Sequence, residues 1–142
     1  MSAGTGIMHA EFNHEREPTT LFQIWIRPHT ARVAPRWEQR RFPKDDRAGA
    51  LVPLASGREA DLAQGALMIH QDATVYGATL PTGATVSHPL GRDRRGYLVV
   101  SSGRAKVNGL ELGPRDGARI ADVETLEIDP LEDTELLLAD LP

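Results

Sequence analysis

Hydrophobic positions in the second half of the chain follow a period of two, in short runs separated by Gly, Asn and Pro. From residue 94 to 140 these runs are rich in Val, Ile and Leu, and no helical period appears. The strongest local signal is Asn108-Gly109, which lies between the runs 105–107 and 110–112. Asn and Gly both tolerate the positive φ that a tight hairpin turn requires. The pattern predicts an all-β domain, built as a small sandwich or barrel.

The same pattern begins near Arg47, where the composition changes. Besides the hairpin and the run after Arg94, strands are expected at 50–55, 66–70, 74–80, 84–87, 118–120, 124–128 and 135–140. Polar loops are expected at 56–64 and 88–93. We therefore divide the chain into two parts, residues 1–47 and residues 48–142.

The first part contains two short apolar runs. Strands are predicted at 7–12 and at 21–26, the second ended by Arg27-Pro28. The proline-containing stretch 29–44 is typical of a linker, in which 35–41 could form a short helix with Pro in its first turn. Trp25 and Trp37 flank this linker and are expected to pack between the two parts.

Composition narrows the function classes. The net charge of −4 and the alternation of basic with acidic residues around Arg40 argue against a nucleic-acid partner. No apolar run is long enough to cross a membrane, and the first residues lack a signal-peptide pattern. The chain has no cysteine, so thiolate chemistry and disulfides are excluded and a cytoplasmic location is expected.

Candidate metal ligands occur near the beginning of the chain. His9 and Glu11 are two residues apart, so on a strand they would share one face. An imidazole and a carboxylate suit a divalent Fe, Ni, Cu or Mn ion. The alternative is a surface strand with two ordinary polar residues. His70 and Asp72 have the same spacing, and we interpret them as core or edge polar residues; His14 and His29 fall in loops and are expected to be solvated.

The glycine spacing of the second part resembles the two signature motifs of cupins, which are small double-stranded β-barrels. Gly83 and Gly103 match the first and last glycine of the first motif. By that resemblance the family's acidic ligand falls at Gly96, and its two histidines fall near Leu90 and Arg92. The second motif begins at Gly113 and has no histidine at the expected position, within 121–124. Because these residues cannot donate lone pairs to a metal, we expect a metal-free barrel.

A more specific resemblance covers nearly the whole chain. The segments that carry it are 1–11, 21–28, 37–42, 69–73, 107–109 and 138–142. They are similar to the pirin-family bicupins, in particular the pirin-like quercetin 2,3-dioxygenases. The resemblance implies that His9 and Glu11 match the third and fourth metal ligands, and that the first two come from a His-x-His segment absent from this sequence. It also implies that 1–47 is the end of a first cupin plus linker, and that 48–142 is the C-terminal cupin.

Two functions from different classes follow. The first is a structural or interaction module, whose exposed apolar strand at 21–26 would pair with another copy to give a homo-oligomer. The alternative is a metal-dependent dioxygenase acting on flavonols such as quercetin, with its site completed by missing or partner-chain residues. That function would need a flavonoid ligand and a divalent metal at His9 and Glu11.

Overall fold

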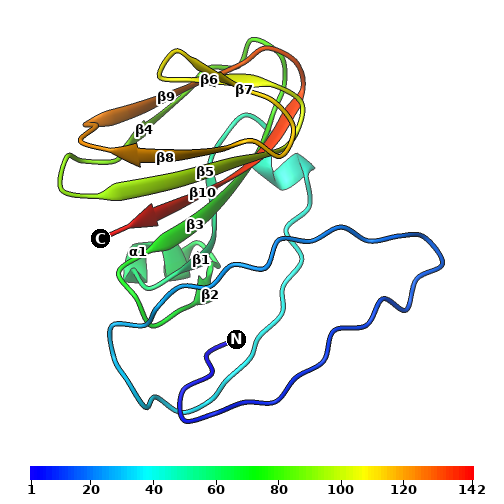
Figure 1. Ribbon diagram of the computed structural model, residues 1–142, viewed down its shortest axis with the longest axis vertical. Helices are drawn as coiled ribbons and strands as arrows, with labels where there is room; N and C mark the ends of the chain where they lie inside the picture. The colour runs from blue at the N-terminus through cyan, green and yellow to red at the C-terminus, as the bar shows by residue number, and fades with distance from the viewer.

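The computed structural model describes residues 1–142 and shows two β-sheets that face each other across one core (Figure 1). The strands are β1 (Val52–Ser56), β2 (Leu67–Met68), β3 (Thr74–Leu80), β4 (Val86–Pro89), β5 (Arg95–Ser102), β6 (Ala105–Val107), β7 (Leu110–Leu112), β8 (Gly117–Ala121), β9 (Thr125–Pro130) and β10 (Thr134–Leu141). A 3-10 turn, η1 (Asp45–Arg47), precedes them, and one short helix, α1 (Glu59–Ala63), follows β1. The predicted all-β cupin fold is confirmed.

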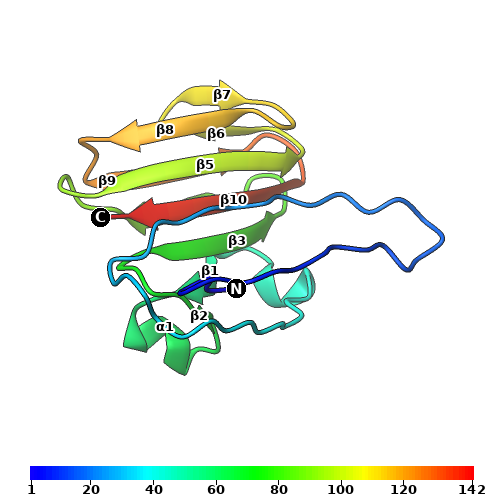
Figure 2. The ribbon, with the colours of Figure 1, turned by 60° about the horizontal axis from the view of Figure 1, so that its bottom comes forward.

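The larger sheet has the order β2-β1-β3-β10-β5-β8, and the smaller has the order β4-β9-β6-β7. The last strand, β10, lies in the middle of the larger sheet and pairs antiparallel with both β3 and β5 (Figure 2). Its buried and half-buried residues alternate strictly, from Thr134 to Leu141. This alternation fixes the register, since a slip of one residue would turn every buried side chain outward.

The core between the sheets is entirely hydrophobic at its centre. Its fully buried members include Leu98, Leu126, Ile128 and Leu138, which come from both sheets. Burial of a Leu or Ile side chain contributes about 1.5–3 kcal/mol. Packing across the two sheets is therefore the main source of stability in this part of the chain.

The predicted hairpin is present. Asn108 and Gly109 both have positive φ, 46° and 84°, between β6 and β7. The Asn108 side chain also accepts a hydrogen bond from the Glu127 backbone N–H at 2.7 Å and donates to the Thr125 carbonyl at 3.2 Å. One residue therefore both makes the turn and ties it to β9.

The prediction of two strands before residue 45 was wrong. Residues 7–12 and 21–26 are extended chain without strand pairing, and 35–41 is not helical. The one pairing in this part is an isolated bridge between Ser2 and Arg36. Figure 2 shows the N-terminal part of the chain, coloured blue, crossing in front of β10 and β3. It continues past the sheets as a long loop. A strand needs a partner for its backbone groups, and neither sheet offers one to these apolar runs.

Two predicted loops hold ordered structure instead. The 56–64 loop contains α1, whose Glu, Ala and Leu residues favour a helix, and Gly65 follows it with a φ of 93°. His88, assigned to a loop, lies in β4 opposite Leu126 of β9. The predicted strand at 66–70 is reduced to β2, so His70 lies beyond the strand end.

Candidate functional site

The predicted metal ligands lie in the extended N-terminal segment. His9 Nε2 and Glu11 Oε1 are 3.7 Å apart, and both side chains are exposed. The two donors have the chemistry that a divalent transition metal prefers, but protein sites for such ions use three or more ligands. The structure has no group of three or more His, Asp or Glu side chains that could hold a metal ion. The pair alone therefore does not fit a complete site.

Of the positions that correspond to cupin ligands, Leu90 and Gly96 lie in the apolar core, whereas Arg92 is exposed and residues 121–124 are exposed or half-buried. Leu90 and Ile120 are buried, and Gly96 lies between them. A Cβ atom at Gly96 would be 3.1 Å from Ile120 Cβ and 3.5 Å from Leu90 Cδ2. Hydrocarbon therefore occupies this place, and a longer acidic side chain at residue 96 would meet both neighbours.

A group of polar side chains lies at one end of the two sheets, where β10 ends and β5 begins. We call it the end cluster, and it consists of Arg58, Asp72, Tyr76, His88, Arg94 and Asp140. Asp140 lies on the same face of β10 as the core residues Leu136 and Leu138. The cluster therefore replaces the apolar core at this end.

Asp140 is the centre of the end cluster and is 1% exposed. Arg58 donates from Nη1 to its Oδ2 at 3.1 Å, and Arg94 donates from Nε to its Oδ1. His88 Nε2 lies 3.7 Å from Oδ2. Burial alone would raise the pKa of Asp140, but His88 and the two guanidinium groups lower it overall. The carboxylate is therefore held in its charged form.

Asp72 is the second carboxylate of the end cluster and lies at the surface. Its Oδ1 accepts from Arg58 Nε and its Oδ2 accepts from Arg94 Nη1, both at 3.1 Å. The hydrogen bond from Arg58 is the largest influence on Asp72 and lowers its pKa. Burial opposes this shift, and the charge and hydrogen bond of Arg94 and the charge of Arg58 lower the pKa further. Each arginine thus bridges one buried and one exposed carboxylate.

His88 and Tyr76 form the inner wall of the end cluster. Their rings pack edge to face, with centroids 4.9 Å apart. The His88 side chain is 12% exposed, and its Nε2 is buried without a hydrogen-bond partner. Burial, and secondarily the charge of Asp61, raise the pKa of Tyr76, so its hydroxyl stays protonated.

A buried hydrogen-bond network of Ser56, Asp61 and Thr74 lies next to the end cluster. Ser56 and Thr74 both donate to Asp61 Oδ2, at 2.6 and 2.7 Å, and their hydroxyl oxygens are 2.8 Å apart. The Arg58 backbone N–H donates to Ser56 Oγ at 3.0 Å. This network fixes the start of α1 against β1 and β3, and so positions the arginine.

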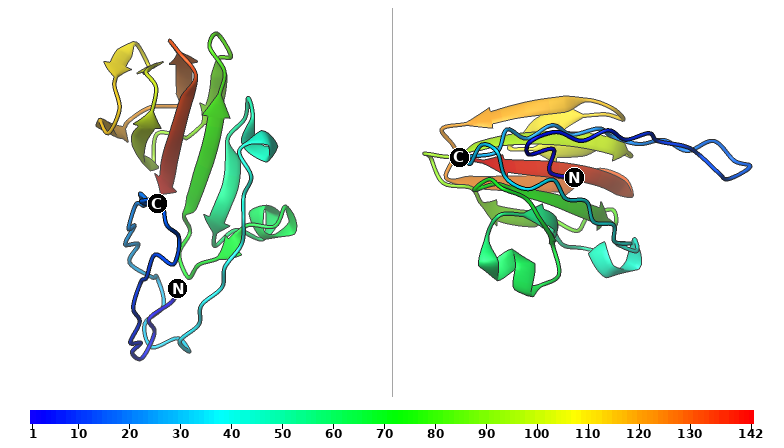
Figure 3. Two further views of the ribbon diagram at one scale, coloured as in Figure 1. Left: turned by 90° about the vertical axis from the view of Figure 1, so that its right-hand side faces the viewer. Right: turned by 90° about the horizontal axis from the view of Figure 1, so that it is seen from below.

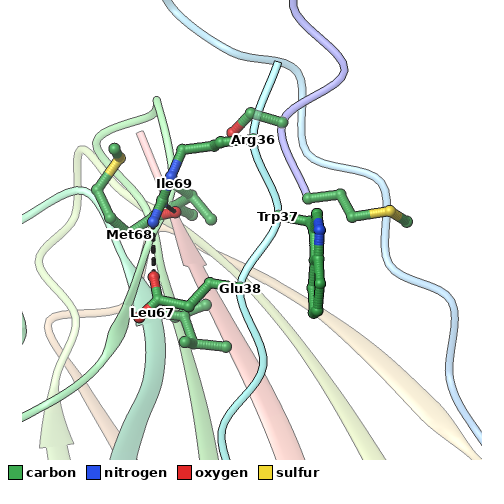
Figure 4. Close-up of a pocket in the computed structure, with 9 residues that line it drawn as sticks. Arg36, Trp37, Glu38, Leu67, Met68 and Ile69 are labelled. Carbon is green, nitrogen blue, oxygen red and sulfur yellow. Dashed lines mark hydrogen bonds and ion pairs between the residues drawn. The ribbon is translucent and has the colours of Figure 1, made fainter. Parts of the chain in front are cut away.

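The N-terminal segment borders two hollows on the larger sheet. One, of about 70 Å³, lies where Arg36 and Trp37 meet β2, and Arg36 Nη1 donates to the Met68 carbonyl at 2.9 Å. Figure 4 shows Trp37 on the side away from Met68. The other, of about 350 Å³, lies between Trp25 and Tyr97 on the outer face of β5 and β10. Trp25 and Trp37 are 86% and 68% exposed, so the prediction that they pack between the two parts was wrong.

Comparison with known proteins decides the family. The family described as the quercetinase C-terminal cupin domain matches residues 54–141. The chain belongs to this pirin-type quercetinase family. A pirin-like protein of Caulobacter vibrioides is 52% identical over 99% of this chain and 60% of its own length. The quercetin 2,3-dioxygenase of Escherichia coli K12 is 38% identical over 100% of this chain and 59% of its own length.

A solved structure of a pirin-type protein has the same fold. The E. coli pirin YhhW in complex with nickel(II) superimposes with a TM-score of 0.73 at 31% identity, over 81% of this chain and 47% of that one. The present chain spans about 60% of the length of the curated relatives it matches. One solved pirin-type protein thus binds a divalent metal, nickel(II).

Sequence reasoning found some residues of these sites and missed others. His14 and His29 are exposed, as predicted, and Asp72 lies at the edge of the fold. The end cluster was missed because its members are far apart in sequence; Arg58 and Asp140 are separated by 82 positions. The available signal was Asp140, a charged residue at a core position of an alternating strand.

No helix in the structure has the length and hydrophobicity needed to cross a membrane.

Proposed function

We propose that this chain acts as a structural and interaction module of the pirin-type family, through a C-terminal cupin that carries no metal. The observation that carries the proposal is the packing of Leu90 and Gly96 against Ile120 at two of the places where cupin ligands would stand. Aliphatic groups at those places offer a metal no lone pairs. The proposal includes residues 48–142 as the cupin unit, residues 1–47 as the end of a first cupin with its linker, and a cytoplasmic location, which the lack of cysteine favours.

The interaction surface in this proposal is the extended N-terminal segment. Large apolar side chains are exposed along it, namely Met8, Phe12, Leu21, Phe22, Ile24 and Trp25. Exposed apolar patches of this kind mark contact sites with other chains. Unpaired extended backbone also pairs readily with a second copy. We therefore expect a homo-oligomer that buries this segment.

Light scattering of the purified chain at micromolar concentration tests this function. The expected result is a dimer or larger assembly, which Phe22→Asp with Ile24→Asp shifts toward monomer. The matched control is Leu110→Asp, another exposed apolar residue on the far hairpin, which should leave the assembly unchanged. A monomeric wild-type chain would contradict the interaction role.

A second candidate is a metal-dependent dioxygenase acting on flavonols such as quercetin. It is supported by the 3.7 Å approach of His9 to Glu11 and by the nickel(II) complex of the E. coli pirin. A bound divalent Fe, Ni, Cu or Mn ion would act as a Lewis acid on the substrate oxygens. Because this chain supplies only two ligands, the remaining ones must come from outside residues 1–142.

Quercetin consumption by the purified chain separates the two candidates. The chain is incubated with each of the four metals in turn, and the loss of flavonol absorbance is followed. The module proposal expects no turnover above that of the free metal. Turnover that disappears in both His9→Ala and Glu11→Ala, with the fold intact by circular dichroism, would establish the dioxygenase instead.

A further inference from the structure

Asp72 lies in a two-arginine clasp, which we define as Arg58 and Arg94. Each of its carboxylate oxygens accepts one N–H, from Arg58 Nε and Arg94 Nη1, at 3.1 Å. Guanidinium groups present paired N–H donors that match the two oxygens of a carboxylate. The clasp is thus a carboxylate-binding arrangement whose present occupant is a side chain of the same molecule.

The clasp is built independently of its occupant. Arg58 and Arg94 are both held from below by the buried Asp140, and Arg94 Nη2 also donates to the Asp72 backbone carbonyl at 3.0 Å. The Arg58 backbone is fixed by Ser56. These anchors do not involve the Asp72 carboxylate, so the clasp stays in place when that carboxylate leaves.

The occupant, in contrast, is weakly held. The Asp72 side chain is 62% exposed and lies in a bend between β2 and β3. Ion pairs at such exposure contribute little to stability, and water and salt compete for them. With Asp72 removed, two guanidinium groups face one carboxylate, Asp140, and a net positive charge points toward solvent.

A polar atom next to the clasp makes no hydrogen bond. His88 Nε2 is buried, and its charged neighbour is Asp140 Oδ2 at 3.7 Å, beyond hydrogen-bond distance. Burying a polar atom without a hydrogen bond is unfavourable, and a water or an ion bound beside the atom is one way to satisfy it. His88 lies with Tyr76 on the inner wall, next to the arginines.

We propose that the Arg58–Arg94 clasp is a binding site for small carboxylate anions, with Asp72 as a built-in competitor that the ligand displaces. The site is independent of the family's metal chemistry, because it uses neither His9 nor Glu11. A tethered carboxylate competes at an effective concentration of about millimolar or higher. Wild-type affinity is therefore low, and it rises when the competitor loses its charge.

Titration of the full chain with sodium citrate, by calorimetry and by the NMR shifts of the arginine Nε–Hε groups, tests this site. Asp72→Asn keeps the shape and the backbone acceptors but removes the charge. We expect it to bind citrate at least about tenfold more tightly than the wild type, with shifts at Arg58 and Arg94. Asp133→Asn is the matched control, since Asp133 is another exposed carboxylate that accepts hydrogen bonds, from Thr82, and it should behave as the wild type.

A second variant keeps the test decisive. Adding Arg58→Lys to Asp72→Asn retains a positive charge beside Asp140 but removes the paired donors, and should abolish the gain. Equal citrate affinity in the wild type and Asp72→Asn would overturn the proposal. An unchanged gain in the double variant, or an equal response to sodium sulfate at the same ionic strength, would also overturn it.

Discussion

Arg58 Nη1 lies 3.1 Å from Asp140 Oδ2, which joins the turn after the first strand to the last strand across 82 positions of sequence. Arg94, just before β5, contacts the other oxygen of the same carboxylate. One buried side chain thus fixes the ends of β1, β5 and β10 relative to one another. Charge pairing therefore holds together this end of the two sheets, which lies beside the C-terminus (Figure 3).

Replacement of Asp140 by Ala should strongly destabilise the fold. The change leaves the guanidinium groups of Arg58 and Arg94 without their buried partner, and loss of one partner of a buried pair costs about 3–5 kcal/mol. Urea unfolding followed by circular dichroism measures the effect. Glu111→Ala breaks an exposed pair with Arg104 and is the control, expected to cause a much smaller loss. Equal losses would contradict a central role for Asp140.

Stability should fall at acidic pH. The folded-state pKa values of Asp72 and Asp140 lie below their unfolded values, so between the two values the unfolded state binds more protons. Their contribution is therefore complete above the unfolded value of about 4 and is lost as the pH falls through the folded values. Urea unfolding between pH 6 and pH 2.5 should show this decline, and Asp140→Asn should flatten it. A variant with the same slope as the wild type would contradict the assignment.

Replacement by Val should change the stability of the fold differently at two threonines of β3. Thr74 donates to the buried Asp61 at 2.7 Å, so Thr74→Val removes a hydrogen bond to a charged group and should cost about 1–3 kcal/mol. The Thr79 hydroxyl is buried without a partner, so Thr79→Val should be neutral or slightly stabilising. Urea unfolding of both variants gives the free energies of unfolding to compare. If the Thr79 variant is as unstable as the Thr74 variant, the hydrogen bond to Asp61 is not the cause of the loss.

Gly109→Ala should strain the hairpin. Gly109 has a φ of 84°, where a Cβ costs about 1–2 kcal/mol. Gly113→Ala is the control, because its φ is not in the left-handed region and an added Cβ would lie 3.5 Å from Asp116 Oδ2, an ordinary contact. Thermal unfolding should show a lower Tm for the first variant alone. Equal Tm values would contradict the tight-turn geometry.

Local signals predicted the parts of the fold that local chemistry determines. Asn108-Gly109 specifies its own turn, and alternation placed β3 and β10 within a residue or two. The run 21–26 failed because its apolar composition favours a strand, but a strand forms only where another strand accepts its hydrogen bonds. The end cluster could not be assembled from sequence, since Arg58, Asp72 and Asp140 meet only through the pairing of β1, β3 and β10.

We propose that residues 48–142 offer no metal site and that His9 and Glu11 are the metal donors that this chain supplies. Equilibrium dialysis against nickel, followed by elemental analysis, tests it most directly. We expect clearly less than one equivalent of retained nickel, and His9→Ala should remove what remains. One full equivalent that persists in the His9→Ala, Glu11→Ala double variant would place the donors elsewhere and contradict the claim.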